Sequence, residues 1–94
     1  YQLKFEDETL QRAYQFEAGQ FNMLYLPGIG EVPISMSSDP SESGVIGHTI
    51  RYAGNVTRAI GKLQVGDVMG VRGPYGSAWP LVRLAGDDLC IVTG

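Results

Sequence analysis

GEVPISMSS, residues 30–38, is the stretch that decides the fold, because it is a strand pattern that carries small hydroxyl side chains beside a rigid proline. A second stretch, RYAGNVT at residues 51–57, runs from a strand pattern through a glycine into the start of a short helix. Free N–H groups at a helix start attract anions, so this second stretch has the geometry that receives a phosphate. Together the two stretches indicate a nucleotide site.

Composition excludes several other classes of protein. The 94 residues are enough for one small domain with a single core, and a second domain does not fit. Only seven Lys and Arg residues are present and the net charge is −3, whereas a nucleic-acid backbone requires clustered positive charge. We therefore expect no nucleic-acid partner.

The single cysteine and the hydropathy pattern indicate where the protein works. One cysteine forms no internal disulfide and provides no cluster for zinc or iron–sulfur, which fits a reducing compartment. The N-terminal residues alternate polar and apolar side chains, and no segment reaches the roughly 20 apolar residues of a membrane span. These features predict a soluble, cytoplasmic domain.

Glycine and proline divide the chain into short apolar runs. The 13 Gly and five Pro residues fall between these runs, a pattern typical of many strands joined by tight turns. The only helix we expect covers residues 56–62, with Asn55 as its N-cap. The class is therefore all-β, a small Greek-key antiparallel barrel with one short helix. The expected strands cover residues 2–6, 21–26, 34–37, 45–52 and 67–72.

The C-terminal run, LCIVTG at residues 89–94, differs from the rest of the chain. It predicts a buried parallel strand just before a glycine-rich turn, the usual start of a nucleotide-binding βα unit, with Cys90 as a buried, inert thiol. A closing strand of the same small domain is the alternative, since so short a run is ambiguous. We expect residues 1–88 to form the barrel and residues 89–94 to begin an NAD(P)-binding α/β domain.

Six motifs in order resemble one family. The chain is similar to the FAD-binding barrel of the ferredoxin-NADP⁺ reductase superfamily, and within it to the electron-transfer subunits of dihydroorotate dehydrogenase, sulfhydrogenase gamma subunits and anaerobic sulfite reductase B subunits. The resemblance implies that one strand is missing before Tyr1 and that an NAD(P)-binding domain follows Gly94. The motifs are AGQF (18–21), PIS (33–35), HTIRYAG running into NVT (48–57), VGD (65–67), RGPYG (72–76) and IVTG (91–94).

The resemblance places a flavin-binding strand on four consecutive residues, Val32, Pro33, Ile34 and Ser35. It implies that the Ser35 hydroxyl bonds the N5/O4 edge of the isoalloxazine and that Ile34 packs against the ring. Val32 departs from the family, which carries an arginine there to neutralise the FAD pyrophosphate.

The family's second flavin strand falls on Thr49, Ile50 and Arg51. Arg51 is therefore one candidate for the compensating cation that Val32 does not supply. Arg58, in the first turn of the expected helix, is the other.

A phosphate turn is implied at Gly54, Asn55, Val56 and Thr57. In the family, the glycine permits close backbone approach, free N–H groups face the pyrophosphate, and a hydroxyl at the position of Thr57 adds a hydrogen bond. Read without the resemblance, these residues make an ordinary helix cap. Ser35 is likewise open to interpretation as an ordinary strand hydroxyl.

Other polar and aromatic residues are expected to be structural. His48 has no second histidine or cysteine nearby, so we expect a partly exposed strand residue. Residues 6–8 form an acidic run that predicts a solvated turn, and neither a catalytic carboxylate pair nor a metal site is expected. Tyr75 and Trp79 are expected to pack between the barrel and the domain that follows.

The function implied by the resemblance is electron transfer within an NAD(P)H-dependent flavin oxidoreductase. A nicotinamide held by the NAD(P)-binding domain would pass a hydride to flavin N5, and the flavin would release single electrons to an iron–sulfur centre on another segment or subunit. NAD(P)H and the iron–sulfur cluster would lie outside residues 1–94, which alone would be inactive. The expected partner is a hydrogenase or reductase catalytic subunit. A non-enzymatic β-barrel interaction module is the alternative, and FMN is the alternative cofactor.

Overall fold

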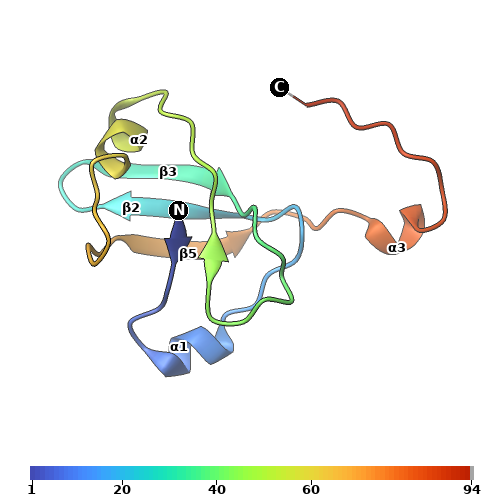
Figure 1. The fold of residues 1–94 in the computed structure, drawn as a ribbon, viewed down its shortest axis with the longest axis horizontal. Helices are drawn as coiled ribbons and strands as arrows, with labels where there is room; N and C mark the ends of the chain where they lie inside the picture. The colour runs from blue at the N-terminus through green and yellow to red at the C-terminus, as the bar shows by residue number, and fades with distance from the viewer. Residues whose placement is uncertain (94) are drawn as a thin grey trace.

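The computed structural model describes residues 1–93 and contains two antiparallel sheets and three short helices (Figure 1). The larger sheet has the strand order β3-β2-β5, and the smaller sheet pairs β1 with β4. Helix α2 lies beside β3, whereas α1 lies at the opposite end of the body (Figure 1). The strands are β1 (Gln2–Leu3), β2 (Phe21–Leu26), β3 (Gly30–Ser35), β4 (Ile46–Gly47) and β5 (Gly70–Tyr75), and the helices are α1 (Glu8–Ala13), α2 (Asn55–Ile60) and α3 (Leu81–Leu84).

The hairpin of β2 and β3 is the centre of the fold. Leu24 pairs with Val32 in this hairpin, and the turn is closed by Gly28 at φ +77, a left-handed conformation that favours glycine. β3 is an edge strand of the sheet, which explains why it tolerates Pro33, a residue that has no N–H to donate to a neighbour.

The core lies between the hairpin and α2. Leu24 and Leu26 on β2 and Ile60 on α2 are its buried members. Around them pack half-buried apolar side chains, among them Val32, Ile34, Ile50 and Val56. Burial of apolar surface contributes roughly 25 cal/mol per Å² to the free energy of folding. This small cluster is therefore the main source of the domain's stability.

The β-rich antiparallel class is confirmed, but the sheets do not close into one barrel within residues 1–93. The strand predicted over residues 2–6 shortens to β1, and the one predicted over 45–52 shortens to β4. Near β4 the Gly47 N–H donates to the Ser38 side-chain Oγ (2.8 Å) instead of to a backbone carbonyl. Side-chain hydrogen bonds of this kind replace part of the expected ladder.

The expectation of a single helix was wrong. The predicted helix is present as α2, but it begins at Asn55 and its N-cap is Gly54. The acidic run at residues 6–8 starts α1, because the Asp7 carboxylate accepts a hydrogen bond from the Thr9 N–H (2.7 Å) and caps the helix. α3 is a single turn that follows Pro80.

The C-terminal prediction also differs from the structure. Residues 89–93 form no strand, and Ile91 and Val92 are 81% and 92% exposed. Cys90 is exposed, so the predicted buried thiol is wrong. This segment runs away from the sheets (Figure 1), where it finds no apolar surface to pack against. Gly94, the last residue of the predicted strand, lies outside the described residues.

The last strand of the large sheet is shifted from its predicted position. β5 covers Gly70–Tyr75 instead of residues 67–72, so it includes Gly73 and Pro74. Tyr75 packs against Phe21 of β2, with ring centroids 5.8 Å apart. The Trp79 N–H donates to the Ala18 carbonyl (2.8 Å), while most of its side chain is exposed.

Candidate functional site

The first group of predicted site residues occupies the end of β3. Val32 and Ile34 turn toward the core and pack against its buried members, while Pro33 and Ser35 are exposed on the opposite face. The valine therefore occupies a position where the fold uses an apolar side chain. Ser35 is the last residue of β3, and its side chain is open to solvent.

The second group, residues 49–51, lies beside the end of β3. A β-bridge joins Met36 to His48, and the hydroxyls of Ser37 and Thr49 are 3.0 Å apart. Ile50 packs on the core, and Thr49 and Arg51 are exposed on either side of it. The structure thus brings the two predicted flavin strands together.

Thr57 fixes the shape of the turn that leads into α2. Its hydroxyl donates to the Gly54 carbonyl (3.1 Å) and accepts from the Ala53 and Gly54 N–H groups (2.9 and 3.0 Å). A hydroxyl has one hydrogen and two lone pairs, so all of its capacity is used inside the protein. The structure therefore favours the capping role for this hydroxyl over a direct bond to a phosphate.

The fold does not explain why position 54 is a glycine. Its φ of −148 is extended backbone that other residues adopt readily, and nothing lies within 4 Å of the position that a Cβ would occupy. The N–H groups of Asn55 and Val56, in the first turn of α2, have no acceptor within the helix. Open space beside free donors fits a phosphate that approaches the backbone closely.

Two guanidinium groups are available near this turn. Arg51 precedes it and Arg58 lies on α2, and both are exposed. Within residues 1–93 the recorded ion pairs are Arg12 with Glu8 and Arg72 with Glu31, so neither Arg51 nor Arg58 is paired there. The positive charge that Val32 does not carry can thus come from neighbouring elements.

Arg72 does not serve the same purpose. Its Nε donates to Glu31 (3.0 Å) and its Nη2 to the second carboxylate oxygen (2.9 Å), a fork that joins β5 to β3 across the exposed face of the sheet. The Glu31 hydrogen bonds raise the pKa of Arg72 further above its usual range. This arginine is therefore committed to the sheet.

A buried polar cluster behind Ser35 was not predicted from the sequence. His48 is 1% exposed, which corrects the expectation of a partly exposed residue. Burial lowers its pKa, opposed in part by a hydrogen bond to the Ser35 carbonyl (3.1 Å). Its partner is Asn22, fully buried on β2, whose side chain also accepts from Tyr14. The strict alternation of β2, which directs Asn22 inward with Leu24, is the signal that could have revealed it.

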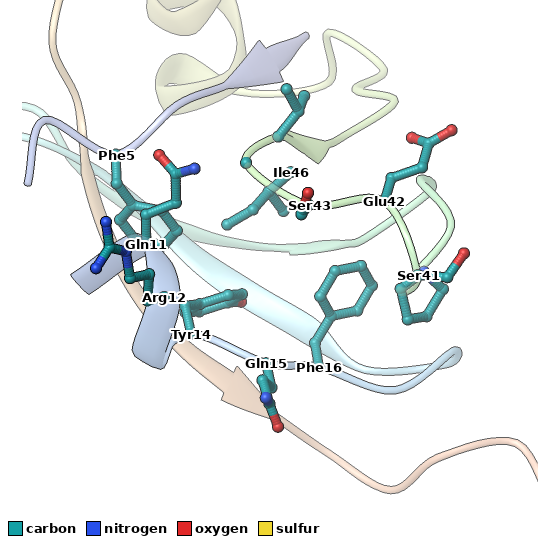
Figure 2. Close-up of a pocket in the computed structure, with 13 residues that line it drawn as sticks. Phe5, Gln11, Arg12, Tyr14, Gln15, Phe16, Ser41, Glu42, Ser43 and Ile46 are labelled. Carbon is teal, nitrogen blue, oxygen red and sulfur yellow. The ribbon is translucent and has the colours of Figure 1, made fainter. Parts of the chain in front are cut away.

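A separate pocket of about 250 Å³ lies between α1 and the loop of residues 40–46 (Figure 2). Aromatic side chains from the N-terminal segment, Phe5, Tyr14 and Phe16, form one part of its lining, and Ile46 and Glu42 lie across from them. None of the predicted flavin-site residues lines this pocket. It is distinct from the site at the end of β3.

No helix in residues 1–93 is long and apolar enough to cross a membrane. No group of three His, Cys, Asp or Glu side chains within the same residues is arranged to hold a metal ion.

The strand end, the open glycine turn and the two exposed guanidinium groups are features that a β-rich nucleotide-binding domain requires. Comparison with known proteins makes the class specific: this chain belongs to the family of oxidoreductase FAD-binding domains, whose model matches residues 1–79. The family suggested by the six motifs is confirmed. This match favours a flavin domain over the alternative of a non-enzymatic interaction module.

The relatives include sulfhydrogenase gamma subunits and dihydroorotate dehydrogenase electron transfer subunits. The sulfhydrogenase 1 subunit gamma of Pyrococcus furiosus is 44% identical over 89 residues, which are 95% of this chain and 30% of that subunit. The sulfhydrogenase 2 subunit gamma of the same organism is 37% identical over 94 residues, 100% of this chain and 32% of that subunit.

A probable dihydroorotate dehydrogenase B (NAD(+)), electron transfer subunit, of Methanocella arvoryzae is 38% identical over 76 residues, 81% of this chain and 26% of that protein. This chain therefore spans less than a third of the length of each of these relatives. No solved structure matches it.

Proposed function

We propose that this chain binds FAD between the end of β3, residues 49–51 and the start of α2, as the flavin domain of an NAD(P)H-dependent electron-transfer protein. When bound, a flavin accepts a hydride from a nicotinamide and releases electrons one at a time. Membership of the FAD-binding domain family and the arrangement of the three segments support this proposal.

The observation that carries the proposal is the open space at Gly54. Neither the backbone conformation nor the packing of this chain requires glycine there, yet Gly54 directly precedes the first turn of α2, whose N–H groups have no acceptor within the helix. We infer that the FAD pyrophosphate lies against Gly54, Asn55 and Val56, with Arg51 and Arg58 supplying positive charge. Thr57 would shape this turn through its hydrogen bonds to residues 53 and 54.

The isoalloxazine would lie at the end of β3. The exposed Ser35 hydroxyl can both donate and accept, so it suits a ring edge whose protonation changes with its redox state. Thr49 and the exposed edge of Ile34 would complete the contact, with Pro33 holding the strand rigid. Val32, which packs on the core, would act only by supporting this strand.

The remaining partners are proposed from the relatives and from the exposed C-terminal segment. The relatives' names include a hydrogenase subunit and an NAD(+)-linked electron-transfer subunit. NAD(P)H would be held by an NAD(P)-binding domain that packs against Leu89, Ile91 and Val92, and electrons would pass to an iron–sulfur partner or a catalytic subunit. A single cysteine fits a cytoplasmic location.

Reconstitution of the full chain with FAD tests the proposal. We expect a bound-flavin absorption spectrum, and we expect Gly54→Ala to weaken FAD binding about tenfold or more by displacing a charge-assisted hydrogen bond. Val65→Ala is the control, because it changes a fully exposed side chain outside the proposed site. Absence of bound flavin, or equal weakening by both variants, would contradict the proposal. Chromatography of the released flavin distinguishes FAD from FMN.

A further inference from the structure

A chain of hydrogen bonds crosses the interior and ends on the backbone of Ser35. The Tyr14 hydroxyl, just after α1, donates to the Asn22 Oδ1 on β2. The Asn22 Nδ2 lies 3.4 Å from the His48 Nε2, and the His48 Nδ1 lies 3.1 Å from the Ser35 carbonyl oxygen. Asn22 and His48 are 0% and 1% exposed, so water does not compete for these bonds.

The donor and acceptor of each hydrogen bond in this series follow from its last acceptor, the Ser35 carbonyl. A carbonyl only accepts, so the His48 Nδ1 carries the hydrogen, and in a neutral imidazole the Nε2 is then an acceptor. The Asn22 amide donates to that nitrogen and turns its oxygen to the Tyr14 hydroxyl. Burial of His48 lowers its pKa and so favours this neutral form.

The Ser35 carbonyl needs a partner of this kind. Met36 donates to the Gln20 carbonyl, which makes residues 20 and 36 a hydrogen-bonded level of the hairpin. Ser35, opposite Phe21, is on the next level, where antiparallel strands turn their backbone groups away from each other. Its carbonyl therefore points to the outer edge of β3, where the His48 side chain meets it.

The fold makes room for this arrangement from the other side of β2. A Cβ on Gly73 of β5 would clash with the Asn22 Oδ1, and the φ of this glycine is +150. β5 thus carries glycine where any larger residue would displace the Asn22 side chain. Residues of β2, β3, β5 and the segment after α1 therefore all contact this series of hydrogen-bonded groups.

We propose that Tyr14, Asn22 and His48 are positioning residues for Ser35. By holding the Ser35 carbonyl they fix the end of β3, and with it the place of the Ser35 hydroxyl relative to the flavin ring edge. This inference rests on the proposed function, because it assigns to Ser35 a contact with the flavin. It adds that the strength of this contact, and hence the balance between oxidised and reduced flavin, is set from the protein interior.

Two conservative variants of His48 separate positioning from mere support. His48→Asn places an amide nitrogen near the former Nδ1 and keeps the donor to Ser35, whereas His48→Gln places its amide near the former Nε2 and loses that donor. The full chain loaded with FAD gives the first readout, the ratio of its affinities for oxidised and reduced flavin. We expect His48→Gln to change this ratio roughly fivefold, the scale of one hydrogen bond, and His48→Asn to keep it within about twofold.

The second readout needs no flavin. The ¹³C shift of the Ser35 carbonyl reports its hydrogen bond, and it should move in His48→Gln and stay in His48→Asn. Tyr14→Phe removes only the far end of the chain and should produce a smaller change in the same direction, which keeps the test decisive if His48→Gln does not fold.

The two readouts separate the failure of this inference from the failure of the proposed function. Equal affinity ratios in all variants, or a Ser35 carbonyl shift that ignores the difference between Asn and Gln, would overturn the positioning role. A wild-type chain that binds no FAD would instead overturn the proposed function, while the carbonyl shift would still show whether His48 holds Ser35.

Discussion

The Thr57 hydroxyl holds the turn before α2 by hydrogen bonds, at the place where the FAD pyrophosphate is proposed to bind. Thr57→Val leaves the half-buried N–H groups of Ala53 and Gly54 without an acceptor, and we expect it to lower the free energy of unfolding by about 1–2 kcal/mol. Thr57→Ser keeps the hydroxyl and should lose much less. Urea unfolding of the two variants checks this, and equal stability would show that the capping bonds contribute nothing.

His48 should make stability depend on pH. Burial lowers its pKa below the ordinary value of 6.5, so the unfolded chain takes up a proton that the folded chain excludes. The stabilisation is therefore complete above about pH 6.5 and is lost as the pH falls below it. Tyr14, the other ionisable side chain of the buried chain, stays neutral throughout because burial raises its pKa.

Urea midpoints measured at about pH 7.5 and about pH 5 test this dependence, since most carboxylates stay ionised over that range. We expect a fall for the wild type and a smaller one for His48→Asn, which has no titratable side chain at this position. A wild-type midpoint that is constant or rises toward pH 5 would contradict the buried neutral imidazole.

Some residues of the candidate site could be predicted from the sequence, and others could not. Ser35 and Gly54 stand in motifs whose order points to them, and the structure leaves both accessible. His48 stands alone in the sequence, so nothing local indicates that Asn22, 26 residues away, will bury it. The Thr57 hydroxyl makes all its hydrogen bonds within the protein, and this depends on backbone geometry that a motif does not specify.

Helix α1 depends on its N-cap more than longer helices do. It has six residues, none of them buried, so little packing stabilises it. Asp7→Ala removes the carboxylate that accepts from Thr9 and should cost about 1 kcal/mol, whereas Asp7→Asn keeps the cap. Amide hydrogen exchange of residues 8–13 measures this locally. Equal protection in the two variants would mean that α1 is held by something other than its cap.

Elements with a complete local pattern were predicted best. β2 matches its predicted bounds because alternating side chains and the following Pro27-Gly28 define both its period and its end. The strand predicted over 45–52 shortens to β4 because the Ser38 side chain and the His48 imidazole, which no local pattern reveals, take over backbone bonding there. α1 was missed because an acidic run can cap a helix as readily as it can form a turn.

At the largest scale, residues 1–93 have a small buried core and an exposed C-terminal segment. Three residues form its buried hydrophobic cluster, while Trp79, Val82 and Ile91 expose most of their side chains. A domain of 94 residues with so small a core has little stability to spare. A ligand that joins β3, residues 49–51 and α2 should therefore stabilise it strongly, because those segments share the core.

Thermal unfolding of the full chain makes this expectation quantitative and separates the two halves of the proposed site. FAD at a hundred times its Kd should add about 2.7 kcal/mol, which raises the Tm of a chain of this size by roughly 10–20 °C. Riboflavin, which has the ring but no phosphate, should raise it far less at the same concentration, and FMN should fall between them. Because riboflavin carries no phosphate for Gly54 and the first turn of α2 to bind, a riboflavin shift as large as that of FAD would mean that the phosphate turn is unused.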